Sequence, residues 1–125
     1  MKILGLVLIL FPVLALSSES ECLAAIMHSE ASGDSLEGII AVAQASINRS
    51  KATKRPICSI RGVARKKPPS NISQHYTALA QSILDGGASI VGRADSWERS
   101  KQPKYAGKIT RFIGKHTFYV MKGSK

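Results

Sequence analysis

The sequence has few acidic residues. Eight Asp and Glu stand against eighteen Lys and Arg in 125 residues, which gives a formal net charge of +10. Such an excess of positive charge favours polyanionic partners, namely nucleic acid, anionic lipid or an acidic cell envelope. Six of the basic residues form two runs beside prolines, at 51–55 and 65–67. These runs are either solvated loops or surfaces that bind anionic envelope polymers.

Long apolar runs are also scarce, because only the amino terminus has one. Lys2 precedes an apolar stretch over residues 3–16, and small residues lie at its end. This is the layout of a secretory signal peptide, which we assign to residues 1–18. The run is shorter than the roughly 20 residues of a spanning helix, and Pro12 interrupts it. We expect a secreted or periplasmic protein with no stable membrane span and no nucleic-acid partner; an uncleaved anchor is the alternative.

There are two cysteines, Cys22 and Cys58. In an oxidising compartment they have one possible pairing, so we expect a disulfide between the start of the first helix and the loop after the second. Neither has a Cys or His neighbour at the spacing of metal ligands. The three histidines lie far apart, and no HExxH or GxSxG motif is present. The sequence therefore predicts neither a metal nor another cofactor.

Apolar spacing predicts a small α+β domain over residues 21–125, without internal repeats. We expect helices over residues 21–31 and 35–50, the second central and buried, and a third from about residue 73 to Gly86. Asp34 is predicted to cap the second helix together with Glu37. Residues 51–71 and 88–107 are predicted to be irregular. Two β-rich runs around residues 114–115 predict a carboxyl-terminal hairpin.

Glu30 is the acid with the least obvious structural role. It continues an apolar stripe formed by Leu23, Ile26 and Met27, which have helical spacing. Partial burial there would favour the protonated carboxyl, the form that can donate a proton to a leaving oxygen in a sugar-sized cleft. The alternative is a boundary residue at the end of a helix.

Three segments in this order, CLAAIMHSEASGDSLEGIIAVAQASINR, PICSI and GRADSWERSKQPKYAGKITRFIGKHTFY, together resemble the SleB-type cell wall hydrolases. The first segment contains the Glu, the Gly-Asp pair, EG, AVA and NR of the family's opening. PICSI matches the family's Pro and Cys, and Cys22 matches the partner cysteine of exported members. The third segment agrees with the family's closing section. The chain departs from the family at RGVARKKPPSNIS, where many relatives are rich in glutamine and aromatic residues.

This resemblance implies a lysozyme-like transglycosylase fold and cleavage of peptidoglycan between N-acetylmuramic acid and N-acetylglucosamine. The family's catalytic glutamate corresponds to Glu30. Ser96 and Trp97 occupy the segment that lies near the sugar, and Tyr119 could offer its hydroxyl. For Trp97 and Tyr119, packing inside the domain is the alternative, and for His116 a structural role is expected.

Three forms of activity stay open. A lytic transglycosylase needs one acid/base, whereas a hydrolytic muramidase needs a second acid, for which Asp95 or Asp34 are candidates. The third form is a protein that does not cleave, which would bind peptidoglycan strands or act as a cationic envelope protein.

Overall fold

The computed structural model describes residues 18–60, 70–86 and 90–123. The predicted signal peptide, apart from its last residue, and the basic run at 65–67 lie outside the described residues. The described chain forms an α+β domain, as predicted. Its elements are α1 (Glu19–Ala31), α2 (Leu36–Thr53), the 3-10 turn η3 (Ile57–Ser59), α3 (Ser70–Leu84), β1 (Ser96–Glu98), β2 (Ala106–Ile113) and β3 (His116–Met121).

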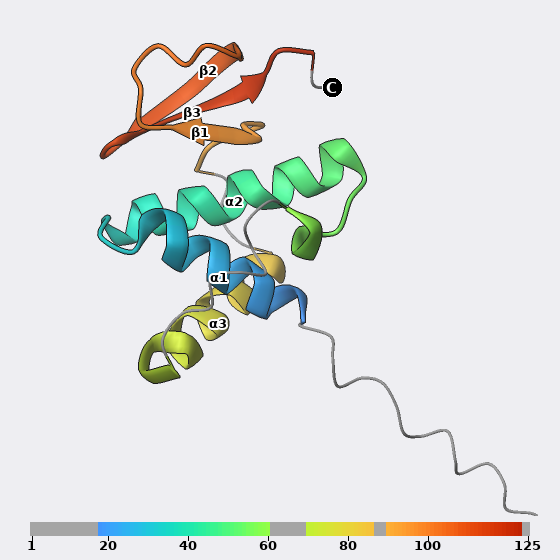
Figure 1. The fold of residues 1–125 in the computed structure, drawn as a ribbon, viewed down its shortest axis with the longest axis vertical. Helices are drawn as coiled ribbons and strands as arrows, with labels where there is room; N and C mark the ends of the chain where they lie inside the picture. The colour runs from blue at the N-terminus through green and yellow to red at the C-terminus, as the bar shows by residue number, and fades with distance from the viewer. Residues whose placement is uncertain (1–17, 61–69, 87–89, 124–125) are drawn as a thin grey trace, which may run out of the picture.

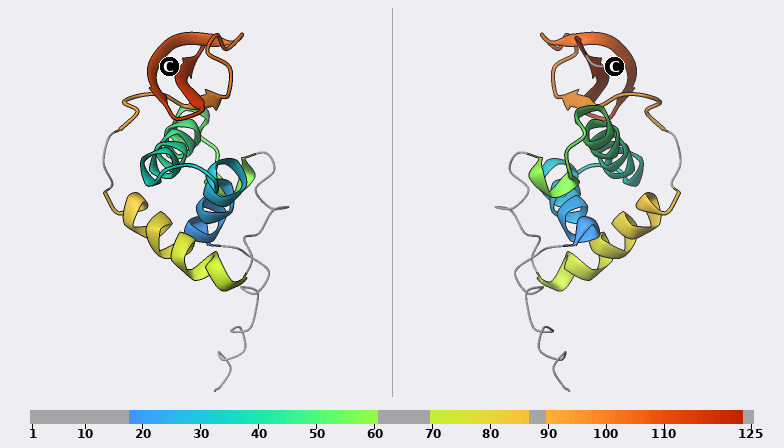
Figure 2. Two further views of the ribbon diagram at one scale, coloured as in Figure 1. Left: turned by 90° about the vertical axis from the view of Figure 1, so that its left-hand side faces the viewer. Right: turned by 90° about the vertical axis from the view of Figure 1, so that its right-hand side faces the viewer.

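The elements are arranged in layers around α2. The sheet packs on one side of α2 and α1 packs on the other, with α3 lying against α1 (Figures 1 and 2). The largest fully buried side chains include Leu23 and Met27 of α1, Val42 of α2, Ile57 of η3 and Phe118 of β3. The core therefore runs from the helices through α2 to the central strand of the sheet.

The first helix begins with a capping box at Ser18. The Ser18 hydroxyl accepts from the Glu21 amide at 3.1 Å, and the Glu21 carboxylate accepts from the Ser18 amide at 2.9 Å. These bonds satisfy groups that a helix start leaves without partners, so the helix begins two residues before the predicted start. Its apolar stripe is buried as predicted, and Leu23 and Met27 have no exposed surface.

The second helix is the buried one, as predicted, but two details of its prediction were wrong. Its cap is Ser35, whose hydroxyl accepts from the Gly38 amide at 3.2 Å, and not Asp34. The helix also continues to Thr53, into the predicted loop, and ends where Lys54 adopts a left-handed conformation. Apart from Val42, the side chains of α2 with no exposed surface are small ones, including Ala41, Ala43 and Ala45, which let neighbouring elements approach α2 on both sides.

The carboxyl-terminal hairpin is confirmed, and it belongs to a larger sheet. Strands β2 and β3 pair antiparallel around Gly114, whose φ of 57° suits glycine in a tight turn. Strand β1 pairs with the other edge of β3, which gives the order β1-β3-β2. The prediction of an irregular segment over residues 88–107 was therefore wrong for residues 96–98 of β1 and for residues 106–107, with which β2 begins. A three-residue strand is too short to show an alternating pattern.

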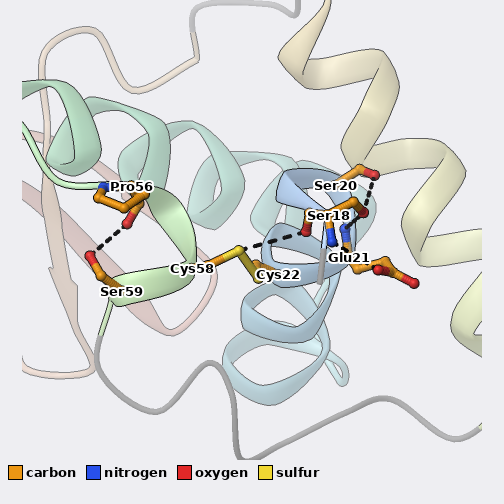
Figure 3. The surroundings of a disulfide bond; sticks show 7 residues. All are labelled: Ser18, Ser20, Glu21, Cys22, Pro56, Cys58 and Ser59. Atoms are coloured by element: carbon orange, nitrogen blue, oxygen red, sulfur yellow. Dashed lines mark hydrogen bonds between the residues drawn. A yellow bond between two sulfur atoms is a disulfide. The ribbon is translucent and has the colours of Figure 1, made fainter. Parts of the chain in front are cut away.

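The predicted disulfide joins Cys22 near the start of α1 to Cys58 in η3, with the Cα atoms 5.2 Å apart (Figure 3). It fastens the segment after α2 to the first turns of α1. A disulfide is consistent with an oxidising, extracellular compartment. Among the described residues, no helix combines the length and apolarity needed to cross a membrane.

Candidate active site

Glu30 lies in the last turn of α1, and its side chain is exposed to solvent. The expectation of a partly sheltered carboxylate was therefore wrong for the free protein. The reason is its position along the helix. Neighbouring elements cover the stripe residues Leu23, Ile26 and Met27, but they leave the face of the final turn at Glu30 open.

Trp97 reaches Glu30 from the sheet. The indole Nε1 donates to Glu30 Oε1 at 3.1 Å, although the two residues are 67 positions apart in the sequence. Trp97 is partly buried in β1, where it pairs with Phe118 of β3. The fold thus brings the predicted catalytic acid and the predicted sugar-stacking ring into direct contact. One carboxylate oxygen is held by the indole, and the ring stays partly accessible.

Arg49 of α2 holds Trp97 from a second side. Its guanidinium carbon lies 5.2 Å from the centre of the Trp97 ring. The same side chain donates from Nε to the Asp95 carbonyl at 2.9 Å and from Nη2 to the Ser96 hydroxyl at 3.3 Å. A planar guanidinium can stack on an aromatic ring and donate hydrogen bonds at its edge, which a lysine cannot do as well.

The neighbouring Asn48 anchors the segment that leads into β1. Its Nδ2 donates to the carbonyls of Gly92 at 2.9 Å and Ala94 at 2.8 Å. Asn48 and Arg49 together fix residues 92–96 against α2. This Asn-Arg pair was predicted only as part of a family motif, and its role beside Trp97 was not predicted. The motif was the one signal that could have found it.

Ser96 and Tyr119, both predicted to contact substrate, are buried and hydrogen-bonded inside the protein. Ser96 donates to Asp95 Oδ1 at 3.1 Å, and the Tyr119 hydroxyl donates to Glu98 Oε1 at 2.8 Å. Burial, followed by the hydrogen bond to Glu98, raises the pKa of Tyr119 from 10.0 to about 12. The two side chains lie on one face of the β1–β3 pair, because Ser96 and Tyr119 are register partners. Their arrangement suits support of the strand that carries Trp97.

The two candidates for a second acid are engaged elsewhere. Asp95 is buried, and its Oδ1 also accepts from the Met121 amide at 2.9 Å. Asp34 Oδ2 lies 3.0 Å from Nδ1 of the buried His116, off the direction of a hydrogen bond. Asp34 thus contacts the hairpin from the turn between α1 and α2.

Two surface hollows lie where the carboxyl-terminal half of α2 meets the sheet. One, of about 540 Å³, is lined by Arg49, Ser96 and Lys122 among others. The other, of about 270 Å³, is lined by Asn48, Lys51 and Arg93 among others. Glu30 lines neither of these hollows. Within the described part of the chain, no three His, Cys, Asp or Glu side chains gather as a metal site.

No family model, curated protein or solved structure matches this chain. The resemblance to the SleB-type hydrolases thus remains an interpretation of the residues. What the geometry adds is a carboxylate, an indole and a guanidinium from α1, β1 and α2, in contact at the surface. Such a group can hydrogen-bond and stack a sugar and can exchange a proton with it.

Proposed function

We propose that this protein is an exported enzyme that cleaves the glycan strands of peptidoglycan between N-acetylmuramic acid and N-acetylglucosamine, with Glu30 as its acid/base. The observation that carries the proposal is the 3.1 Å contact between Trp97 and Glu30. An exposed carboxylate beside a partly buried indole combines proton transfer with a stacking surface. The net charge of +10 favours association with an acidic cell wall.

The contact with Trp97 also orients the carboxylate. Since Oε1 accepts the indole N–H, Oε2 is the oxygen that would meet the glycosidic oxygen. Arg49 covers one face of the Trp97 ring, so a sugar would stack on the other face. Glu30 is exposed in the free protein, and the bound glycan must therefore supply the burial that favours its protonated form.

The proposed reaction needs one acid/base. Glu30 gives its proton to the glycosidic oxygen, and the bond between that oxygen and the anomeric carbon of the muramic acid breaks. The Glu30 carboxylate then takes the proton of the 6-hydroxyl of the same sugar, whose oxygen bonds to the anomeric carbon. The product is a 1,6-anhydro ring, no water is consumed, and Glu30 ends protonated.

The contacts of Asp34 and Asp95 support this transglycosylase form over hydrolysis with either of them as the second acid. Asp95 accepts hydrogen bonds within the sheet, and Asp34 faces His116. A hydrolase would need a second carboxylate on the opposite side of the scissile bond from Glu30.

A glycan-binding protein without cleavage is the second candidate, and the exposure of Glu30 favours it. In this form Trp97 and Glu30 would hold the sugar by stacking and hydrogen bonding alone. Purified peptidoglycan would then sediment with the protein but would not lose turbidity.

The test is the loss of turbidity of purified peptidoglycan with Glu30→Gln. We expect a fall in rate of at least roughly 100-fold, the usual contribution of a general acid/base. Glu37→Gln is the matched control, because Glu37 is an exposed glutamate whose carboxylate lies 3.6 Å from Arg111. It should keep the full rate. Equal rates for Glu30→Gln and the wild type would reject the enzymatic proposal and favour a cationic envelope protein.

A further inference from the structure

A basic hollow of about 620 Å³ lies at the tip of the β2–β3 hairpin, on the side of the loop that follows β1. Its walls carry Arg99, Lys101 and Lys115, which are all exposed. His116 and Thr117, both buried, also line it. The volume falls in the range of sites that hold small ligands or a few residues of peptide.

The charged side chains that line this hollow are all basic. Within the described part of the chain, Arg99, Lys101 and Lys115 form no salt bridge. Glu98, which precedes Arg99, accepts from Tyr119, and Asp34 faces the buried His116. Three cations that line one hollow and form no salt bridge repel one another, and a bound anion would relieve that repulsion.

The hollow also has an apolar wall. The side chain of Phe112, which is 58% exposed, also lines it. A large exposed aromatic side chain beside fixed charges suits a ligand that has both carboxylates and aliphatic parts. A short acidic peptide has both.

The hollow is close along the chain to the proposed cleavage site. Arg99 follows Trp97 by two residues, a distance of at most about 7 Å along the chain. Peptidoglycan carries a short acidic peptide on each muramic acid, and four extended residues reach up to roughly 14 Å. A muramic acid beside Trp97 and Glu30 could therefore place its peptide in the hollow.

We propose that this hollow binds the carboxylates of the peptide stems of peptidoglycan, through Arg99, Lys101 and Lys115 with Phe112 as the apolar wall. The inference rests on the proposed function for its choice of ligand. The enzyme thus distinguishes glycan strands that carry peptides from bare ones. Because the cations are exposed, binding weakens as the salt concentration rises.

The test measures binding of a synthetic stem peptide with free carboxylates by the fluorescence of Trp97, the single tryptophan of the chain, and by calorimetry. We expect the double variant Lys101→Ala/Lys115→Ala to bind about tenfold more weakly. The double variant Lys104→Ala/Lys108→Ala is the matched control, because it removes the same charge from exposed lysines that do not line the hollow. It should bind within about twofold of the wild type.

A peptide with amidated carboxylates should bind at least tenfold more weakly than the acidic one. Three results would overturn the inference: no binding of the acidic peptide, equal binding of the amidated peptide, or an equal loss in the control variant. Competition by inorganic phosphate at the concentration of the peptide would reassign the hollow to phosphate polymers. If wild-type protein cleaves peptidoglycan without binding the peptide, only this inference fails. If it binds the peptide without cleaving, the proposed function fails instead.

Discussion

The helices and the sheet bury different kinds of side chain. In α1 and α2 the buried residues are almost all apolar, with alanine prominent, and the Cys22–Cys58 disulfide fastens η3, which follows α2, to the start of α1. The segment from residue 90 onward buries Asp95, Ser96, His116 and Thr117 around Phe118. Polar side chains of α2, which lie far from this segment in the sequence, donate hydrogen bonds to it. The helices thus form the stable support, and the sheet is a hydrogen-bonded layer that places Trp97 beside Glu30.

The largest effect on stability is expected when the disulfide beside the helices is removed. The bridge closes a separation of 36 residues, and the double variant Cys22→Ser/Cys58→Ser should lose about 4 kcal/mol of unfolding free energy in urea. Reduced wild-type protein is the control and should match the variant. Trp97 fluorescence reports on the sheet, and far-ultraviolet circular dichroism reports chiefly on the helices. Coincident transitions would mean that the two parts unfold together, whereas an unchanged midpoint would contradict the role given to the bridge.

The next test measures how the stability provided by the sheet changes as the pH is raised. The pKa of Tyr119 is about 12 in the folded protein and 10.0 in the reference state, so the fold favours the neutral phenol. Its stabilising contribution is complete below pH 10 and is lost as the pH rises to 12, because the unfolded chain ionises first. The loss should be on the order of 2 kcal/mol.

Tyr119→Phe should lack this component. The difference in unfolding free energy between wild type and variant should therefore fall between pH 10 and 12, while lysine titration affects both proteins alike. Ultraviolet titration should also show that one of the three tyrosines ionises last. A pH-independent difference would show that neither burial nor the contact with Glu98 raises the pKa of Tyr119.

The smallest expected effect is at the junction of the two parts. Arg49→Lys keeps the charge but loses the two hydrogen bonds to residues 95–96 and weakens the stacking on Trp97. We expect a loss of about 1 kcal/mol and a shift of Trp97 fluorescence. Arg55→Lys, at an exposed position after α2, is the control and should change neither. Unchanged fluorescence in Arg49→Lys would remove Arg49 from the support of the indole.

The same contrast explains what could be predicted from the sequence. The stripe of α1, the buried α2, the hairpin at Gly114 and the disulfide follow from local spacing or from a single possible pairing. The Asn48 and Arg49 contacts and the Trp97–Glu30 bond join residues 44 to 67 positions apart, and local patterns carry no record of them. The short β1 pairs with residues of β3 that lie 19 to 23 positions further along the chain. Glu30 has one feature that could be predicted from the sequence and one that could not. Its helical face was predictable, but its exposure depends on how far the neighbouring elements extend along α1.

Whether Glu30 transfers the proton is tested most directly by mass spectrometry of the sugar ends released from purified peptidoglycan. The wild type should release fragments that end in 1,6-anhydro-muramic acid, and Glu30→Gln should release almost none. Hydrated reducing ends from the wild type would contradict the transglycosylase reaction. Equal amounts of anhydro ends from the two proteins would contradict the role of Glu30 itself.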